Sequence, residues 1–387
     1  MEYIEVLDSN SNCGDCYFRG TIVEIGSIPK HGKYYTWNWA PQLEALKSDI
    51  QILSIYDQTN EIDKPPHLKE AEEQYSAHQL ANSTAMVCQS LCERDLIPDR
   101  VYLDLFNSRE MVSREISRAF SRPSEYEILA KATKIVHDIR THRIDFALSK
   151  VHSAKQVKII KNKLDRVSYN VRGAVTGRLT TEKGSFPIMT LSRSDRGFVV
   201  PTNDMLVEFD FNAAESRVLL ALAGHEQPEV DIHLWNMKNI DKKFTTRREA
   251  KEAFFAWLYN HDLSDSAWDK EYSKDIYRDF YSSGAVETPF CRNIKVDERR
   301  ALNYLIQSTS SDLNIEQVYK IREILSGTGS FIKFLLHDSV VIDVKMEDVG
   351  LLKDIFAAFR DTRFGRFKVN IKTGRDFYNM EDLNWKV

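Results

Sequence analysis

Two acidic residues stand where one apolar segment gives way to another. Asp210 and Glu215 follow MLVEF (205–209) and precede VLLALAG (218–224). The first segment predicts a buried strand, and the second continues at helical period until Gly224 ends it. Because a strand is rigid and its tip meets solvent, an acid at that point is well placed to hold a metal ion.

A third acid lies far downstream in a similar setting. Asp338 is in the middle of FIKFLLHDSVVIDV (331–344), an apolar stretch that predicts a hairpin. Two acids on adjacent strands, reached from distant parts of the sequence, are what a two-metal phosphoryl-transfer site requires. The sequence therefore predicts that Asp210 and Asp338 meet at one site.

A stripe of cations and aromatic residues lies between these acids. Arg247, Lys251, Phe255 and Tyr259 recur every four residues, so a helix keeps them on one face over about 18 Å. Two cations followed by two rings match a nucleoside triphosphate laid along the helix, with the cations at the phosphates and the rings at sugar and base. The alternative is an amphipathic helix that buries its aromatics, but the paired acids favour the nucleotide.

The bulk composition is that of an ordinary globular protein. The 387 residues are 42% hydrophobic and 28% charged, long enough for two or three subdomains. We expect a cytoplasmic protein and no membrane partner, because neither a membrane-length apolar run nor a secretory signal occurs. A net charge of −4 means that nucleic acid would be bound by local basic patches.

One basic patch runs from Arg143 to Arg172, with six further cations against two acids. The alternative is that these side chains simply form a solvent-exposed face, as most runs of charge do. Here the run leads into a Gly/Thr/Arg segment and then into the acidic strand, which favours binding to a phosphate backbone. The cations between the two ends are Lys150, Lys155, Lys158, Lys161, Lys163 and Arg166.

The five cysteines are expected to be reduced. Cys13 and Cys16 form a CxxC pair, and Cys88 and Cys92 a CxxxC pair. Four such thiolates could bind zinc. The long separation of the pairs fits compact zinc motifs poorly, so structural thiols are the default and zinc stays open.

The order of segments predicts an α+β protein interrupted by helical parts. Residues 107–123 and the stretch from Ile128 to Ile139 predict two helices of a mostly helical arm. The divisions that we expect are a small N-terminal region of unknown role at 1–65, a mostly helical part at 66–160, a mixed part at 161–235, a helical part at 236–285 and a second mixed part at 286–387.

Several separated motifs, in the same order, resemble the family A DNA polymerases, the group typified by bacterial DNA polymerase I. The resemblance covers about 160–387 continuously. The segments that carry it are VSYNVRGAVTGRLTT (167–181), DFNAAESRVLLALAG (210–224) with DIH (231–233), the Arg247–Tyr259 stripe, VETPFCR (286–292), RALNYLIQST (300–309), LLHDSVVIDV (335–344) and FKVNIKTGRDF (367–377).

The resemblance implies a right-hand fold with a helical thumb at 66–160, an antiparallel-sheet palm at 161–235 and 286–387, and helical fingers at 236–285. It implies template-directed addition of dNTPs to a primer 3′-OH with two Mg²⁺ ions, or Mn²⁺ in their place. Primer-template DNA and dNTPs are the implied partners, and a separate exonuclease, helicase or processivity factor is left open. Asp210, Asp338 and the Phe211 carbonyl would bind the metal ions.

The resemblance also implies a role for each remaining site residue. Lys251, counted among the catalytic groups, would hold the triphosphate together with Arg247 and His233. Phe255 would stack on the sugar, Tyr259 would border the templating base, and Glu215 would exclude a 2′-hydroxyl. The residues that would contact primer and template are Arg178, Arg299, Asn303, Gln307 and His337.

The chain departs from the family pattern in four respects. Ser339 stands where a second acid often follows the motif C aspartate, and Asn260 stands where glycine is usual. The stretch between Asn260 and Val286 is short, so the fingers are expected to be trimmed. About 65 residues before the arm are too few for a 3′–5′ exonuclease domain, so we expect no intrinsic proofreading.

Two other functions are compatible with these motifs. A single-subunit RNA polymerase has a related palm, although Glu215 and Phe255 argue against it. A non-catalytic DNA-binding accessory subunit could keep the fold, although both acids and both phosphate-binding cations are present. Replication and repair roles are not distinguished by the sequence.

Overall fold

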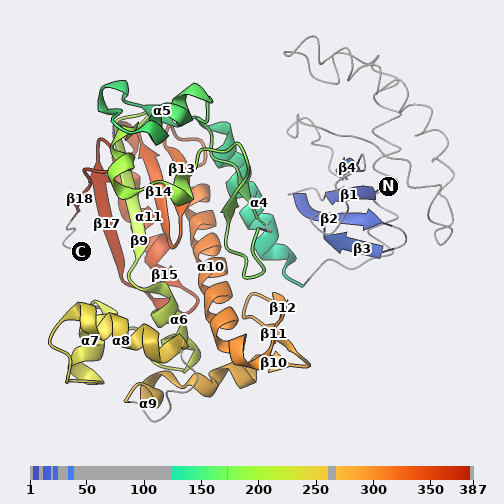
Figure 1. The fold of residues 1–387 in the computed structure, drawn as a ribbon, viewed down its shortest axis with the longest axis vertical. Helices are drawn as coiled ribbons and strands as arrows, with labels where there is room; N and C mark the ends of the chain where they lie inside the picture. The colour runs from blue at the N-terminus through green and yellow to red at the C-terminus, as the bar shows by residue number, and fades with distance from the viewer. Residues whose placement is uncertain are drawn as a thin grey trace. The chain divides into compact units, whose positions relative to one another are not determined.

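The computed structural model describes residues 124–171, 173–259 and 267–383, and the backbone of four strands near the N-terminus (Figure 1). The chain divides into two compact units, Met1–Thr133 and Lys134–Val387, which we describe separately. In the first unit β1 pairs antiparallel with β2 and parallel with β4, in the sheet order β3-β2-β1-β4. The strands are β1 (Tyr3–Leu7), β2 (Asn12–Phe18), β3 (Thr21–Glu24) and β4 (Tyr34–Asn38).

The second unit is built on a five-stranded antiparallel sheet of order β13-β14-β9-β17-β18. The strand that lies in its middle, β9, is the one that carries Asp210 (Figure 1). Its neighbours come from more than a hundred residues downstream, as the paired-acid pattern predicted. The strands are β9 (Met205–Phe211), β13 (Phe331–Leu336), β14 (Ser339–Val344), β17 (Val369–Gly374) and β18 (Glu381–Asp382).

One face of the sheet is closed by a helix. Val207, Phe209 and Phe211 alternate along β9 and are buried, because side chains of a strand point to opposite faces in turn. Phe211 stacks on Phe359 of α11 (Leu352–Arg360) with ring centroids 4.2 Å apart. The opposite face carries the half-buried Glu208 and Asp210, and remains available for chemistry.

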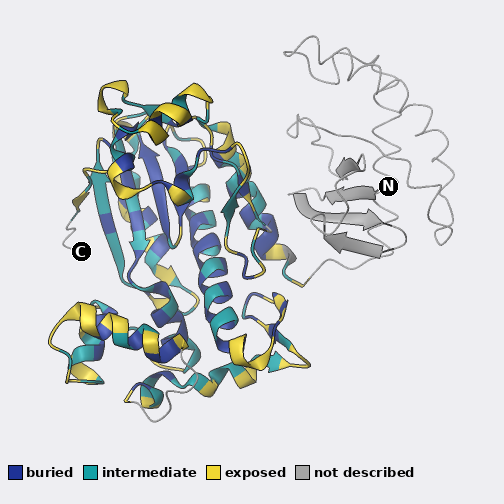
Figure 2. Ribbon diagram, viewed as in Figure 1, coloured by how far each residue is buried: buried dark blue, intermediate teal, exposed yellow. Residues whose placement is uncertain are grey.

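The longest helix, α10 (Glu298–Ile324), supports both the sheet and the helical lobe. Its side chains are largely buried, as the dark segments of Figure 2 show. The helical lobe packs on α10 through one apolar cluster rich in aromatic rings. Its helices are α6 (Ala214–Leu222), α7 (Ile232–Asn239), α8 (Arg247–Tyr259) and α9 (Asp269–Tyr272).

The remaining elements surround this core. Helix α4 (Tyr126–Thr141) joins the arm to the sheet unit, and α5 (Ala154–Lys161) begins with a Ser153 capping box. The short strands form one sheet of order β10-β11-β12 and the pairs β5–β8, β6–β7 and β15–β16. They are β5 (Asp145–Phe146), β6 (Tyr169–Asn170), β7 (Thr180–Thr181), β8 (Val199–Val200), β10 (Tyr281–Ser282), β11 (Ala285–Glu287), β12 (Asn293–Lys295), β15 (Asp361–Thr362) and β16 (Gly365–Arg366).

The remaining short elements are 3₁₀ helices of three or six residues, which stand between the longer helices and strands. They are η3 (Leu148–Lys150), η4 (Ile188–Thr190), η5 (Arg193–Phe198), η6 (Lys274–Asp279) and η7 (Met346–Leu351).

The predicted α+β class agrees with this mixture of helices and antiparallel sheets. The helix from Ile128 to Ile139 is present as α4, whereas the helix predicted at 107–123 lies outside the described residues. Among the described helices none is both long and apolar enough to cross a membrane.

Candidate functional site

The two acids meet at the open face of the sheet. Strand β9 continues to Phe211, two residues beyond the predicted end, so Asp210 lies within the strand rather than after it. Asp338 lies in the turn between β13 and β14, and the next residue, Ser339, pairs with Asp210 across the antiparallel ladder. The Phe211 amide N lies 3.5 Å from the Asp338 carbonyl O. The predicted juxtaposition of the acids is therefore present.

Left-handed backbone accompanies both acids. Ala213, three residues after Asp210, has φ +54°, and His337, directly before Asp338, also has φ +54°. This region is uncommon for residues other than glycine, and such strain persists only where surrounding contacts hold it. At the second turn the Asn314 Nδ2 of α10 donates to the His337 carbonyl over 3.2 Å. These turns redirect the chain next to each carboxylate.

Burial disfavours the charge on both carboxylates. Burial raises the pKa of Asp210 to about 6, and Glu208 adds repulsion while the Asn370 hydrogen bond opposes the shift. Burial likewise raises the pKa of Asp338 to about 6, with further repulsion from Glu215 and Asp210. Both groups thus lie where a bound cation would gain most from their negative charge.

One cavity of about 740 Å³ gathers most of the predicted site residues. It extends from the sheet face to α8 and is also lined by the segment that carries Arg178. The predicted residues that line it are Arg178, Asp210, Phe211, Glu215, His233, Arg247, Lys251, Phe255, His337 and Asp338. Residues from five separate segments of the chain therefore line one cavity.

Helix α8 presents the predicted stripe to this cavity. Phe254, Trp257 and Leu258 are buried in the lobe's core, whereas Arg247, Lys251 and Phe255 line the cavity. The Phe255 ring lies between His233 and Tyr259, with centroid distances of 6.0 and 5.9 Å. The apolar side of the helix is thus formed by other residues than the stripe.

Glu215 is held by two groups from different elements. Arg178 forms an ion pair with its Oε1, and the Tyr259 hydroxyl donates to its Oε2 over 2.5 Å. Burial and this carboxylate raise the pKa of Tyr259, so the phenol stays protonated and donates. The three side chains link the Thr-Gly-Arg segment, α6 and α8 at one edge of the cavity.

The segment before Arg178 lies on a buried ion pair. Gly177 has φ +75°, and a Cβ there would lie 2.6 Å from Arg292 Nη2 and 2.9 Å from Asp312 Oδ1. Arg292 and Asp312 form a bidentate ion pair in which Nη2 donates to Oδ1 over 2.8 Å. Only glycine allows this approach, which brings Arg178 to the cavity.

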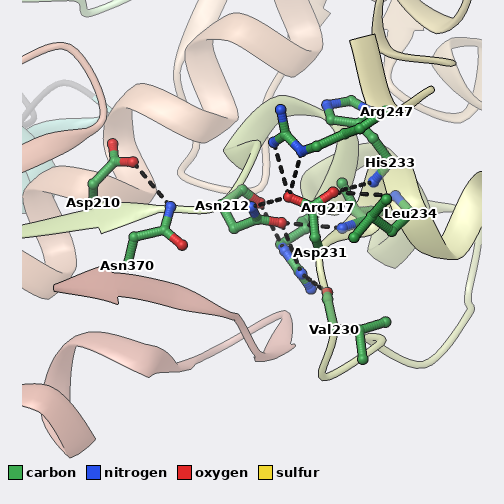
Figure 3. A network of polar contacts seen from close by, with 10 residues as sticks. Asp210, Asn212, Arg217, Val230, Asp231, His233, Leu234, Arg247 and Asn370 are labelled. Carbon is green, nitrogen blue, oxygen red and sulfur yellow. Dashed lines mark hydrogen bonds and ion pairs between the residues drawn. The ribbon is translucent and has the colours of Figure 1, made fainter. Parts of the chain in front are cut away.

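His233 and Arg247 are joined by a residue that we did not predict as a site residue (Figure 3). Asp231 caps α7 through the backbone N–H groups of His233 and Leu234, and its Oδ2 accepts from Arg247 Nε and Nη2. Because these hydrogen bonds stabilise the carboxylate, the pKa of Asp231 is lowered. The sequence signal was its position as an acid directly before a helix.

Asn370 and Glu208 are further polar neighbours of Asp210 that we did not predict. Asn370, opposite Asp210 on β17, donates to Asp210 Oδ2 over 3.3 Å. The Ser339 hydroxyl donates to Glu208 Oε1 over 3.1 Å. The serine that replaces the usual motif C acid thus bonds to an acid on the adjacent strand. Neither contact is visible in local sequence, because both join strands distant in the chain.

Four predicted residues do not line the cavity. Tyr259 contacts two residues that line it, Glu215 and Phe255, and Gln307 lies beside Tyr259. Gln307 donates to Asn303 over 2.6 Å, which places both on one face of α10. Arg299 is exposed near the start of α10, away from the cavity lining.

The donor set fits magnesium rather than an all-protein metal cage. Among residues 124–171, 173–259 and 267–383, no group of three or more His, Cys, Asp or Glu side chains is arranged to hold a metal ion. Mg²⁺ commonly binds one or two carboxylates and takes water and phosphate oxygens as its other ligands. Asp210 and Asp338, buried and mutually repelling, match that requirement.

The predicted zinc alternative lies outside the described side chains. Cys13 and Cys16 fall in β2, of which only the backbone is described, and Cys88 and Cys92 fall outside the described residues. Among the described cysteines, Cys291 is a free, exposed thiol. Zinc binding by the two cysteine pairs therefore stays untested.

Comparison with known proteins supports the motif analysis. The chain is 26% identical to a DNA polymerase of Mycobacterium phage D29 over 42% of its own length, and 25% identical to that of Mycobacterium phage L5 over 40%. The chain resembles DNA polymerases. The matches span 33% and 31% of those relatives, so the chain covers about a third of the length of the curated relatives. No protein-family model matches it.

Among solved structures, the chain matches the polymerase domain of Pol1 from M. smegmatis in complex with DNA primer-template and dNTP. The match has a TM-score of 0.48 and 15% sequence identity, and covers 81% of this chain and 65% of that one.

Proposed function

We propose that the chain is a template-directed DNA polymerase that adds dNTPs to a primer 3′-OH. The observation that carries the proposal is the shared cavity in which Asp210 and Asp338 face Arg247, Lys251 and His233. The similarity to phage DNA polymerases supports the same activity. Primer-template DNA and dNTPs are then the substrates.

We assign the parts of a right hand to the described elements. The five-stranded sheet with α10 and α11 is the palm, and α7, α8 and α9 belong to trimmed fingers. Helix α4 and the segment that follows it to residue 160 belong to the thumb, whose residues 66–123 lie outside the described residues. With α7 counted among them, the fingers would begin at Ile232, four residues before the predicted bound at 236.

Asp210, Asp338 and the Phe211 carbonyl would hold two Mg²⁺ ions. When bound, the ions would supply an activated primer 3′-hydroxyl and charge stabilisation of the departing pyrophosphate. Asn370 orients the Asp210 carboxylate by donating to Oδ2. Because both carboxyl pKa values are raised, a divalent cation offsets charge that the protein alone leaves unbalanced.

Arg247, Lys251 and His233 would bind the triphosphate. Burial lowers the pKa of His233 to about 4, so its ring is neutral at pH 7 and offers an N–H rather than a charge. Phe255, next to His233, would stack on the sugar. The positive charge of Lys251 opposes the rise in the pKa of Asp210, so the two groups interact. Together these groups orient the reacting phosphate toward the acids.

The residues at the other edge of the cavity would contact the primer terminus and template. Arg178 and His337 line the cavity beside Asp338, and Asn303 and Gln307 continue along α10 next to Tyr259. Arg299 stays in this proposed group by resemblance alone, because it is exposed away from the cavity.

The proposal is tested by primer extension with the full chain. A primed DNA template, four dNTPs and Mg²⁺ should give products extended according to the template, and chelation of Mg²⁺ by EDTA should stop extension. Binding to primed DNA with no incorporation in Mg²⁺ or Mn²⁺ would instead identify a non-catalytic accessory subunit. Loss of a mismatched primer end without dNTPs would contradict the predicted lack of proofreading.

Preference for deoxynucleotides is expected from Glu215. Its carboxylate is fixed by Arg178 and Tyr259, so a 2′-hydroxyl beside it would clash or desolvate the charge. Glu215→Ala should raise rNTP incorporation relative to dNTP incorporation by at least tenfold. Unchanged discrimination would remove Glu215 from this role, and a wild-type preference for rNTPs would favour the RNA polymerase alternative.

A further inference from the structure

We propose that Asp231 is a positioning residue that orients Arg247 and His233 toward the triphosphate and ties them to the metal-binding strand. This inference rests on the proposed function. Asp231 would not touch the nucleotide itself. Its effect would pass through the two side chains that do.

Each carboxylate oxygen of Asp231 holds a different element. Oδ1 caps α7, accepting from the His233 N at 3.0 Å and the Leu234 N at 3.1 Å. Oδ2 accepts from Arg247 Nε at 2.9 Å and Nη2 at 2.8 Å, which fixes the first residue of α8. One side chain therefore caps α7 and holds the Arg247 side chain of α8, two of the helices that line the cavity (Figure 3).

The same carboxylate is anchored to the strand of Asp210. Asn212 Nδ2 donates to Asp231 Oδ2 over 2.7 Å, and Asn212 Oδ1 accepts from the Ile232 N at 3.0 Å. Asn212 is two residues after Asp210. Two residues of backbone and direct hydrogen bonds through Asn212 and Asp231 thus connect the proposed metal ligand Asp210 with Arg247 and His233.

Arg217 holds the loop on which Asp231 stands. Its fully buried guanidinium donates to the carbonyls of Asn212, Pro228 and Val230 at 2.8 Å each. Burial lowers the pKa of Arg217 only to about 10, so it stays charged at neutral pH. The loop before Asp231 is therefore fixed to the turn after Asp210.

The geometry favours orientation of Arg247 over sequestration. A guanidinium has five N–H donors, and Asp231 uses one from Nε and one from Nη2. Arg247 Nη1 can therefore donate to a phosphate while Asp231 holds Nε and Nη2. Because such a fork binds oxyanions in a fixed plane, holding one edge sets the direction of the other.

The position of the His233 ring depends on where α7 begins. The ring is fully buried on the cavity wall, and neither ring nitrogen has a hydrogen-bond partner within the described part of the chain. A buried polar group without a partner is costly, so a ligand oxygen would supply what the protein leaves open. The Asp231 cap fixes the turn from which this ring projects.

The test separates the charge of Asp231 from its capping role. Asp231→Asn keeps a side-chain oxygen that can cap α7, since Asn is as good an N-cap as Asp, but loses the charge that holds Arg247. We expect the KM for dNTP in primer extension to rise about tenfold while kcat changes less than threefold. Binding of a dNTP to enzyme carrying a dideoxy-terminated primer should weaken by a similar factor.

A double-mutant cycle with Arg247→Ala tests the route of the effect. If Asp231 acts through Arg247, Asp231→Asn should add little to the KM of the Arg247→Ala variant. Glu252→Gln is the matched control, because Glu252 pairs with Arg248 on the exposed side of the same helix. Its KM should equal that of the wild type.

Each outcome decides the inference. Unchanged or tighter nucleotide binding in Asp231→Asn, with wild-type binding measurable, would overturn it. Parallel loss of kcat and of the thermal unfolding midpoint would indicate a purely structural role, and Asp231→Ser, which also caps, would have to repeat the KM effect in a folded protein. Failure of the wild type to bind or incorporate dNTPs would instead overturn the proposed function.

Discussion

At the residue scale, Asp210 and Asp338 are held in surroundings that oppose their charge. Each carboxyl has a pKa raised to about 6, chiefly by burial. In the folded chain their protonated forms are favoured, so this contribution to stability is full below pH 4 and is lost as pH rises through about 6. At pH 8 the charged pair therefore destabilises the metal-free protein.

Asp338→Asn should make the chain more stable and less active. The amide removes the charge, so we expect the free energy of unfolding at pH 8 without Mg²⁺ to rise by about 1 to 3 kcal/mol. Primer extension should fall by orders of magnitude, because a proposed metal ligand is lost. Thermal unfolding and extension assays measure the two effects.

Asp210→Asn should behave similarly, and Asp354→Asn, on α11 behind the sheet, serves as the control. Added Mg²⁺ should raise the unfolding midpoint of the wild type more than that of either amide variant. Near-normal extension by either variant would contradict the site assignment, and a lower unfolding midpoint would contradict the electrostatic account.

Activity should depend on pH through the same two carboxyls. Metal binding requires the ionised forms, so the extension rate is expected to fall as pH is lowered through about 6. Because Mg²⁺ competes with protons for these oxygens, raising its concentration should shift the midpoint to lower pH. Extension rates between pH 5 and 9 at two Mg²⁺ concentrations provide the measurement. A midpoint near pH 4, indifferent to Mg²⁺, would contradict this explanation.

At the element scale, the close approach of Gly177 to an ion pair positions the Thr-Gly-Arg segment. Gly177→Ala would place a methyl group against Arg292 and Asp312 and also force an unfavourable φ. We expect a loss of about 2 kcal/mol or more in unfolding free energy and a higher apparent Kd for primed DNA, since Arg178 would move with the segment. Denaturant unfolding and DNA titration measure these changes.

Gly184→Ala is the matched control for this effect. Gly184 also has a positive φ, +87°, but a Cβ there would meet nothing within 4 Å. Its substitution should cost only the backbone term of about 1 kcal/mol and leave DNA affinity unchanged. Equal losses in the two variants would show that the ion pair does not matter.

The elements that the sequence predicted are those with local signals. The strand at 205–209, the helix ending before Gly224, the hairpin at 331–344 and the stripe of 247–259 each follow from hydrophobic periodicity. The partners of Asp210 and Arg247 could not be predicted this way. Asn370 reaches Asp210 by strand pairing across 160 residues, and Asp231 reaches Arg247 through loop geometry.

At the scale of the whole molecule, charge is unevenly distributed along the chain. The net charge is −4, yet the segment from Arg143 to Arg172 is basic. Part of this basic segment is structural, since Arg143 pairs with Asp165, Lys150 with Asp376, and Arg166 donates to two backbone carbonyls. The predicted phosphate-binding patch is therefore smaller than its sequence indicated.

Lys158, Lys161 and Lys163 are the exposed cations of this patch for which we expect a role in DNA binding. If each contacts one phosphate, replacing all three by alanine should lower the slope of log K against log salt by roughly 2 to 3. The loss of affinity should be the same for different DNA sequences, since phosphates carry no sequence information. DNA titrations between 50 and 300 mM salt measure the slope.

Lys353→Ala is the control for this charge effect, because Lys353 lies on α11, which covers the sheet face opposite Asp210. A contact there would require duplex on both sides of the sheet at once, so this variant should keep the wild-type slope. Should the triple variant also keep it, Lys158, Lys161 and Lys163 would be solvated charges, and the DNA would have to be held by residues nearer the cavity, such as Arg178.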